Sequence, residues 1–176
     1  MVRRLPGIVL VLVFFGAAVY SDAVLIFTTN SLDPERLSVK ELQSAVEDGA
    51  MAALFDAGHI VFNAGVVAGN PRLKGPSDRL SMRMAKSGGA LFLLEIDLLY
   101  EEPETDEEQL NAPSAQYRLY DVMQDTLLTQ GSLSPGDVRS REDAGPEELS
   151  TALGSAIADH AVSMLRRQGN GEAGDV

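Results

Sequence analysis

Residues 90–100 read Ala-Leu-Phe-Leu-Leu-Glu-Ile-Asp-Leu-Leu-Tyr, between Gly88-Gly89 and a strongly acidic run. In an extended chain, successive side chains point to opposite sides. One side of this stretch is then apolar at every position: Phe92, Leu94, Ile96, Leu98 and Tyr100. The other side begins with leucines and continues with Glu95 and Asp97, which is typical of a strand buried at one end and wet at the other. The pattern predicts that this stretch is the central strand of a sheet.

The sequence before this strand predicts four elements in order: a strand, a helix, a second strand and a second helix. Residues 24–29 and 59–63 are β-prone apolar runs. Between them, residues 38–57 carry apolar side chains at the three-and-four spacing of a helix face, with Ser38 and Glu41 spaced as a capping box and Gly58 suited to a C-terminal cap. A Gly- and Pro-rich connection follows, and a shorter helix is expected over residues 76–86.

The chain after the central strand predicts a meander and a last helix. Residues 101–109 hold six carboxylates and are expected to form a solvated loop. Residues 115–122 and 126–133 are expected as antiparallel strands, and residues 146–168 as a helix with acids in its first turn. A working register matches apolar side chains with one another. It pairs Asp97 with Arg118, Ile96 with Leu119, Leu98 with Tyr117 and Glu95 with Tyr120.

Together these segments predict an α/β (α+β) two-layer sandwich. Its mixed sheet has about five strands with helices packed against it, in the order β-α-β-α-β-β-β-α. The expected organisation is a signal peptide over residues 1–23, one domain over residues 24–168, and a disordered tail over residues 169–176.

The first 23 residues have the order of a secretory signal peptide. Arg3 and Arg4 precede an apolar run over residues 8–19, and small residues follow around Ser21 and Ala23. Cleavage after Ser21 or after Ala23 would fit, and the protein is then expected to be periplasmic or otherwise exported. An uncleaved anchor is the alternative, since residues 24–27 extend the apolar run. Only that alternative predicts contact with the membrane.

Composition excludes several kinds of site and partner. The chain has no Cys, which excludes disulfides, thiolate catalysis, Cys-based metal sites and a lipidated Cys. The formal net charge is −12, and removal of residues 1–23 takes away two positive charges and one negative charge, leaving −13. This balance disfavours nucleic acid and anionic membrane surfaces, and favours a protein partner with a basic surface.

Glu95 and Asp97 are the first candidates for chemistry. Two residues apart on one strand face, with about 7 Å between their Cα atoms, they could hold a divalent cation or act as an acid/base pair. A metal site would need further oxygen ligands, for which Asp121 and Asp125 are the candidates. The simpler interpretation, which the sequence favours, is a polar sheet face on which Arg118 neutralises Asp97.

The remaining candidates point to no reaction. The two imidazoles, His59 and His160, lie in separate predicted elements and outside any nucleophile or metal motif, so structural or solvated roles are expected. The acidic run at residues 101–108 could bind calcium weakly or a basic partner, but it lacks the spacing of a calcium loop. No phosphate-binding glycine pattern occurs, and no cofactor is expected.

Three stretches carry a resemblance to known envelope modules: residues 24–29, residues 84–96 with Ser-Gly-Gly-Ala before an apolar strand, and residues 117–133 as paired strands. They resemble the amino-terminal domain of TolB, the LpoB-type activators of penicillin-binding proteins and the CsgG-like secretion lipoproteins. The lipidated Cys of lipoproteins is missing, and Gln124-Asp-Thr-Leu replaces a Thr-Gly turn. The resemblance implies a noncatalytic periplasmic module that binds another envelope protein, and it transfers no catalytic residue.

Two hypotheses of different classes follow. A binding or assembly module predicts contact through loops and an exposed sheet edge. An exported metal-dependent hydrolase predicts that Glu95, Asp97 and a His converge within coordination distance.

Overall fold

The computed structural model describes residues 22–33, 36–64, 80–101, 110–141 and 143–171. The predicted signal peptide, apart from its last two residues, lies outside the described residues. So do the Gly- and Pro-rich connection from residue 65 onward and most of the acidic run.

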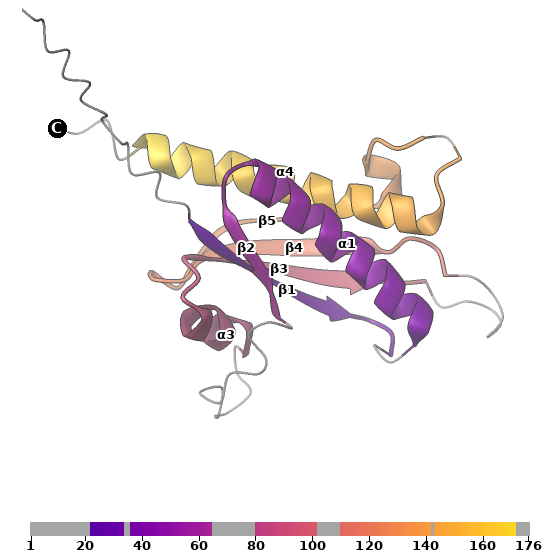
Figure 1. The fold of residues 1–176 in the computed structure, drawn as a ribbon, viewed down its shortest axis with the longest axis horizontal. Coiled ribbons are helices and arrows are strands. Elements are labelled where there is room, and N and C mark those ends of the chain that lie inside the picture. The colour runs from indigo at the N-terminus through magenta and orange to yellow at the C-terminus, as the bar shows by residue number, and fades with distance from the viewer. Residues whose placement is uncertain (1–21, 34–35, 65–79, 102–109, 142, 172–176) are drawn as a thin grey trace, which may run out of the picture.

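The sheet has five strands in the order β2-β1-β3-β4-β5 (Figure 1). The strands are β1 (Ala23–Asn30), β2 (Ile60–Asn63), β3 (Phe92–Leu99), β4 (Ser114–Asp121) and β5 (Thr126–Leu133). β1 is parallel to both β2 and β3, whereas β4 is antiparallel to β3 and β5. β3 therefore lies in the middle of a mixed sheet, which confirms the predicted fold class and the predicted central strand.

Helices pack on both faces of this sheet. α1 (Leu37–Asp56) and α4 (Pro146–Gly171) lie side by side on one face, and α3 (Leu80–Gly88) covers one end of the other face (Figure 1). A short 3-10 helix, η1 (Pro135–Asp137), lies between β5 and α4. Two layers thus describe most of the molecule, and α3 adds a third at one end. No helix within the described ranges is both long and apolar enough to cross a membrane.

The helix ends differ in two places from the prediction. α1 begins at Leu37 with Arg36 as its N-cap and no capping side chain, so the predicted capping box at Ser38 is wrong because Ser38 already lies in the first turn. α4 continues to Gly171, into the segment that was expected to be a tail. Gly58 follows α1 with a φ of 94°, as expected of a glycine that ends a helix.

The main core lies between the sheet and the pair α1 and α4. Leu94 and Ile96 of β3 are completely buried in it, with Val24 of β1 and Ile157 of α4. A smaller core lies beneath α3, where Leu93 of β3 packs with residues that α3 and β1 supply: Leu25, Met82, Met84 and Ala85. The alternation of β3 thus buries one side of the strand along its length and the other side at one end only.

α1 and α4 approach each other closely at two glycines. A Cβ atom added to Gly154 would lie 1.9 Å from the carbonyl oxygen of Val46, and one added to Gly49 would lie 2.0 Å from that of Thr151. Ser155 Oγ also donates a hydrogen bond to the Gly49 carbonyl oxygen at 3.2 Å. The two helix backbones are in direct contact here, and only glycine fits.

The pairing of β3 with β4 differs from the working register by two residues. Arg118 pairs with Glu95 rather than with Asp97, and Ile96 pairs with Tyr117 rather than with Leu119. A slip of two residues leaves every side chain on the same face, so the apolar pattern alone could not distinguish the two registers.

Candidate functional site

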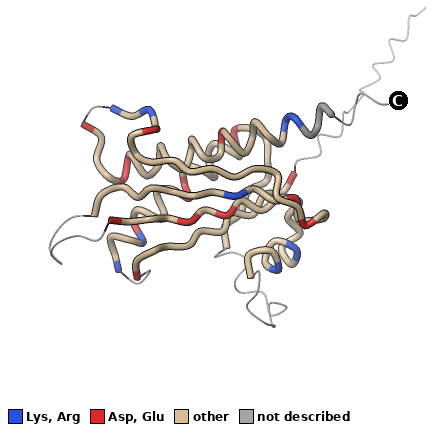
Figure 2. The backbone as a smooth tube through the Cα atoms, turned by 180° about the vertical axis from the view of Figure 1, so that it is seen from behind, with Lys and Arg blue, Asp and Glu red and all other residues tan. Residues whose placement is uncertain are grey.

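Part of the α3 side of the sheet is covered by no described element. We call this surface the open face. It is formed by side chains of β1, β3, β4 and β5 that are exposed or half-buried. They are Thr29, Glu95, Asp97, Gln116, Arg118, Gln130 and Ser132. Figure 2 shows that charged residues of neighbouring strands meet in the middle of this side of the sheet.

Arg118 lies between the two candidate carboxylates. Its Nε is 3.1 Å from Glu95 Oε2, and its Nη2 is 2.6 Å from Asp97 Oδ2. The remaining carboxylate oxygens accept hydrogen bonds from hydroxyls: Glu95 Oε1 from Ser81 Oγ at 2.5 Å, and Asp97 Oδ1 from Thr29 Oγ1. Every carboxylate oxygen of the pair therefore has a protein partner.

The register explains this arrangement. Arg118 is directly opposite Glu95, and Asp97 is the next residue of β3 on the same face, so one guanidinium reaches both acids. The side chain of Arg118 is 41% exposed and that of Asp97 is 31% exposed. The Arg118–Asp97 pair then contributes about 0–1 kcal/mol to stability, as is usual for ion pairs that water screens.

The other predicted oxygen ligands lie at the β4–β5 hairpin and have local roles. Asp121 Oδ1 accepts a hydrogen bond from the backbone N–H of Gln124 at 2.8 Å. Asp125 has a φ of 55° in the turn, and its Oδ2 lies 3.9 Å from Lys86 Nζ. Asp121 thus stabilises the hairpin turn, and Asp125 connects the turn with α3.

The two histidines do not join Glu95 and Asp97. His160 is an exposed residue of α4, on the opposite side of the sheet, and its Nδ1 lies 2.9 Å from the hydroxyl of Tyr117. His59 precedes β2 at the far edge of the sheet. Within the described ranges, no group of three or more His, Asp or Glu side chains is arranged to hold a metal ion. Among the described residues, Glu95, Asp97 and a His therefore do not converge as the hydrolase hypothesis predicts.

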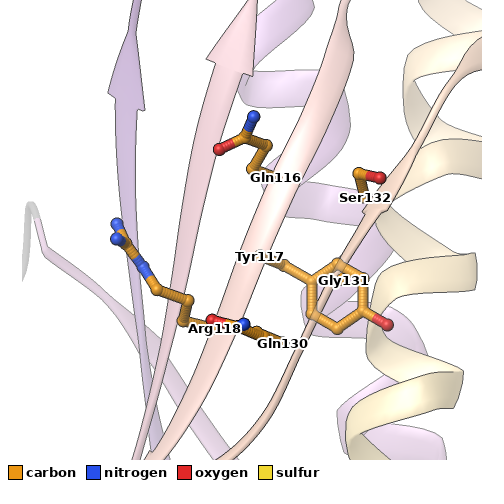
Figure 3. A pocket seen from close by; sticks show the side chains of 6 residues that line it. All are labelled: Gln116, Tyr117, Arg118, Gln130, Gly131 and Ser132. Carbon is orange, nitrogen blue, oxygen red and sulfur yellow. The ribbon is translucent and has the colours of Figure 1, made fainter.

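Tyr117 reaches His160 because β5 carries a glycine opposite it. Gly131 pairs with Tyr117, and a Cβ atom at Gly131 would lie 2.6 Å from the tyrosine hydroxyl oxygen. Figure 3 shows the ring of Tyr117 lying over Gly131 and pointing toward α4. Burial raises the pKa of Tyr117. A glycine inside a predicted strand was the available signal for such a close approach, and the sequence reasoning missed it.

A shallow hollow lies over β4 and β5 (Figure 3). Its volume is about 360 Å³, and it is lined by residues of these two strands only. They are Gln116, Tyr117, Arg118, Gln130, Gly131 and Ser132. Amide, hydroxyl and guanidinium groups line it. This arrangement can offer hydrogen bonds to a bound molecule.

Comparison with known proteins gives neighbours of fold only. No protein-family model and no curated protein matches the chain. Among solved structures, the lipoprotein GNA1162 from Neisseria meningitidis has a TM-score of 0.47 and 19% identity, covering 81% of this chain and 99% of that one. TolB from Acinetobacter baumannii has a TM-score of 0.43 and 12% identity, and the match covers 82% of this chain but 28% of TolB.

The LpoB C-terminal domain from Salmonella enterica is also similar, with a TM-score of 0.38 and 16% identity over 66% of this chain and 84% of that one. The predicted resemblance to TolB and LpoB is therefore confirmed at the level of structural neighbours. At these scores and identities, the likeness gives no argument for a function.

Proposed function

We propose that this protein is a noncatalytic module of the cell envelope that acts by binding another protein. The observation that carries the proposal is that the carboxylates of Glu95 and Asp97 are already bound by other side chains of the protein. All four of their carboxylate oxygens already accept contacts from Arg118, Ser81 or Thr29. Arg118 offsets the negative charge of both carboxylates, so a metal ion at this position would have to compete with a cation that is already there.

Location and partner class rest on sequence features. The basic, apolar and small-residue order of residues 1–23 supports export. The net charge of −12 supports a partner whose contact surface is basic, since like charges would repel an acidic one. The proposal includes no cofactor.

A capture experiment tests the proposal. The protein, purified from the envelope of expressing cells, is immobilised and exposed to envelope extract, and captured proteins are identified by mass spectrometry. The double variant Glu95→Gln, Asp97→Asn should capture the same partner with affinity changed by about twofold or less, because neither carboxylate moves a proton or holds a metal. Capture should weaken with added salt, since exposed charges are screened over about 10 Å at 0.1 M ionic strength.

Glu148→Gln is the matched control, because it removes one acid from an exposed ion pair with Arg141, at 3.0 Å, away from the open face. Melting temperatures of both variants would show that the fold is intact. Stoichiometric binding of a divalent metal that is lost in the double variant, together with loss of a hydrolytic activity, would overturn the proposal in favour of the hydrolase.

A further inference from the structure

β5 forms an edge of the sheet that no strand within the described residues covers. The strand order places β5 at one end, and no described strand lies beyond it. Its eight residues, Thr126–Leu133, include no charged residue and no proline. Exposed edges are usually protected by charges, prolines or very short strands, because their unpaired N–H and C=O groups can bind another chain. β2, at the opposite edge, has only four residues.

The pairing of the strands identifies which groups of β5 point outward. The N–H of Val122 donates to the carbonyl of Leu91, so even-numbered residues of β4 direct their backbone groups toward β3. The odd-numbered residues of β4, Tyr117 among them, then direct their backbone N–H and C=O groups toward β5, where Tyr117 pairs with Gly131. Backbone groups alternate along a strand, so those of Gln130, like those of Ser132, point away from the sheet.

Side chains at this edge are neutral on the open face. Gln130 and Ser132 are exposed and line the hollow beside Gln116. On the opposite face, Leu128 and Leu133 are half-buried against the main core. A strand added at this edge would therefore meet hydrogen-bonding groups on one side and an apolar margin on the other.

The charge at the hairpin end of β5 is acidic. Asp121 and Asp125 lie there, and Lys86, 3.9 Å from Asp125, is half-exposed. Antiparallel strand pairs are the commoner kind, about two- to three-fold over parallel ones. The carboxyl end of an antiparallel strand would lie beside Thr126, next to these acids.

We propose that an extended segment of a partner protein binds as a sixth strand, antiparallel to β5. Its side chains alternate between polar and small apolar, and basic residues follow at its carboxyl end. This inference rests on the proposed function and names the surface and the partner chemistry for it. A second copy of the chain fits less well, because two β5 strands paired about Gln130 would bring Asp125 of one copy close to Asp137 of the other. Hydrogen bonds from Ser134 lower the pKa of Asp137, so that carboxylate keeps its charge.

The chain has no Trp, which makes a Trp-labelled peptide a clean probe. The probe is a synthetic peptide of alternating Thr and Val with one amino-terminal Trp and two carboxyl-terminal Lys residues. A second peptide ends in two Glu residues, and a third has a central Pro. Fluorescence anisotropy should show saturable binding of the Lys peptide, binding roughly threefold or more weaker for the Glu peptide, and none for the Pro peptide.

Hydrogen exchange locates the bound peptide without any substitution. The amides of Gln130 and Ser132 should exchange fast in the unbound protein and become protected when the Lys peptide binds, whereas those of Thr129 and Gly131 should be protected in both states. Protection elsewhere, or no binding of the Lys peptide at millimolar concentration, would overturn the inference. A dimer in which Gln130 and Ser132 are already protected without peptide would also overturn it, because a second copy would then occupy the edge.

Substitution separates this inference from the proposed function. Gln130→Pro removes an outward N–H, and Gln130→Thr keeps it as a matched control. In the envelope capture experiment, Gln130→Pro should lose the partner while Gln130→Thr keeps it, with both melting like the unchanged protein. Undiminished capture by a folded Gln130→Pro variant would overturn the edge inference and leave the proposed function standing. Failure of the unchanged protein to capture any partner would count against the proposed function itself.

Discussion

Gly154→Ala should destabilise the protein, although alanine is the better helix former. Within a helix, alanine is favoured over glycine by about 1 kcal/mol. The added methyl would lie 1.9 Å from the Val46 carbonyl oxygen and 2.9 Å from the Ala50 backbone nitrogen, and neither atom can rotate away. α1 and α4 must therefore move apart.

The magnitude follows from these two opposing effects. Overpacking of a core typically costs about 1–3 kcal/mol, and a clash with backbone atoms favours the upper end of that range. A net loss of about 2 kcal/mol remains after the gain in helix propensity. For a chain of this size, each kcal/mol lowers the melting temperature by about 2–4 °C, so we expect a fall of about 4–8 °C.

Thermal melts followed by circular dichroism would measure the effect. Gly145→Ala is the control, because no atom lies within 4 Å of the added methyl. Gly49→Ala should show a similar loss, and the double variant with Gly154→Ala should lose less than the sum, since helices already separated accommodate the second methyl. A Gly154→Ala variant that melts at or above the temperature of the unchanged protein would refute the close helix contact.

Three further predictions concern the sheet and the tyrosines. Ile96→Ala should cost about 2–5 kcal/mol in denaturant melts, because Ile96 is completely buried, and Glu95→Ala should cost less; equal losses would mean that the faces are wrongly assigned. Tyr117→Phe should cost about 0.5–1.5 kcal/mol through loss of the hydroxyl contact with His160, and an unchanged unfolding free energy would show that this contact contributes nothing. Burial raises the pKa of Tyr100 from 10.0 to about 12, so the unfolded chain loses this proton first and stability falls as pH rises between these values. Tyr100→Phe should reduce that fall, as melts at successive pH values would show.

Much of the fold was predictable because each element has a strong local pattern. The alternation of residues 92–99 and the uncharged run of residues 126–133 identify β3 and β5, and Gly58 marks the end of α1. The register of β4 was not predictable from the apolar pattern, since a slip of two residues preserves it. What settles the position of Arg118 is its simultaneous contact with Glu95 and Asp97, which depends on side-chain reach.

The helix contact and the site were less accessible from the sequence. Gly49 and Gly154 interrupt apolar stripes and look like weak helix positions until the partner helix is known. Gly131 looks like a weak strand position for the same reason, because its role depends on Tyr117 and a distant His160. The position of β5 at an edge of the described sheet could be known only from the strand order, which the order of the five strands along the chain does not determine.

The position of β1 has a consequence for synthesis of the protein. β1 lies between β2 and β3, and its Thr29 hydrogen bonds to Asp97, 68 residues later in the chain. A ribosome releases β1 first, so Leu25 and Ile26, which are completely buried in the finished fold, stay exposed until β3 and the helices that cover them have been synthesised. During that interval the nascent chain exposes an aggregation-prone apolar segment, and a chaperone that holds extended apolar chains would protect it.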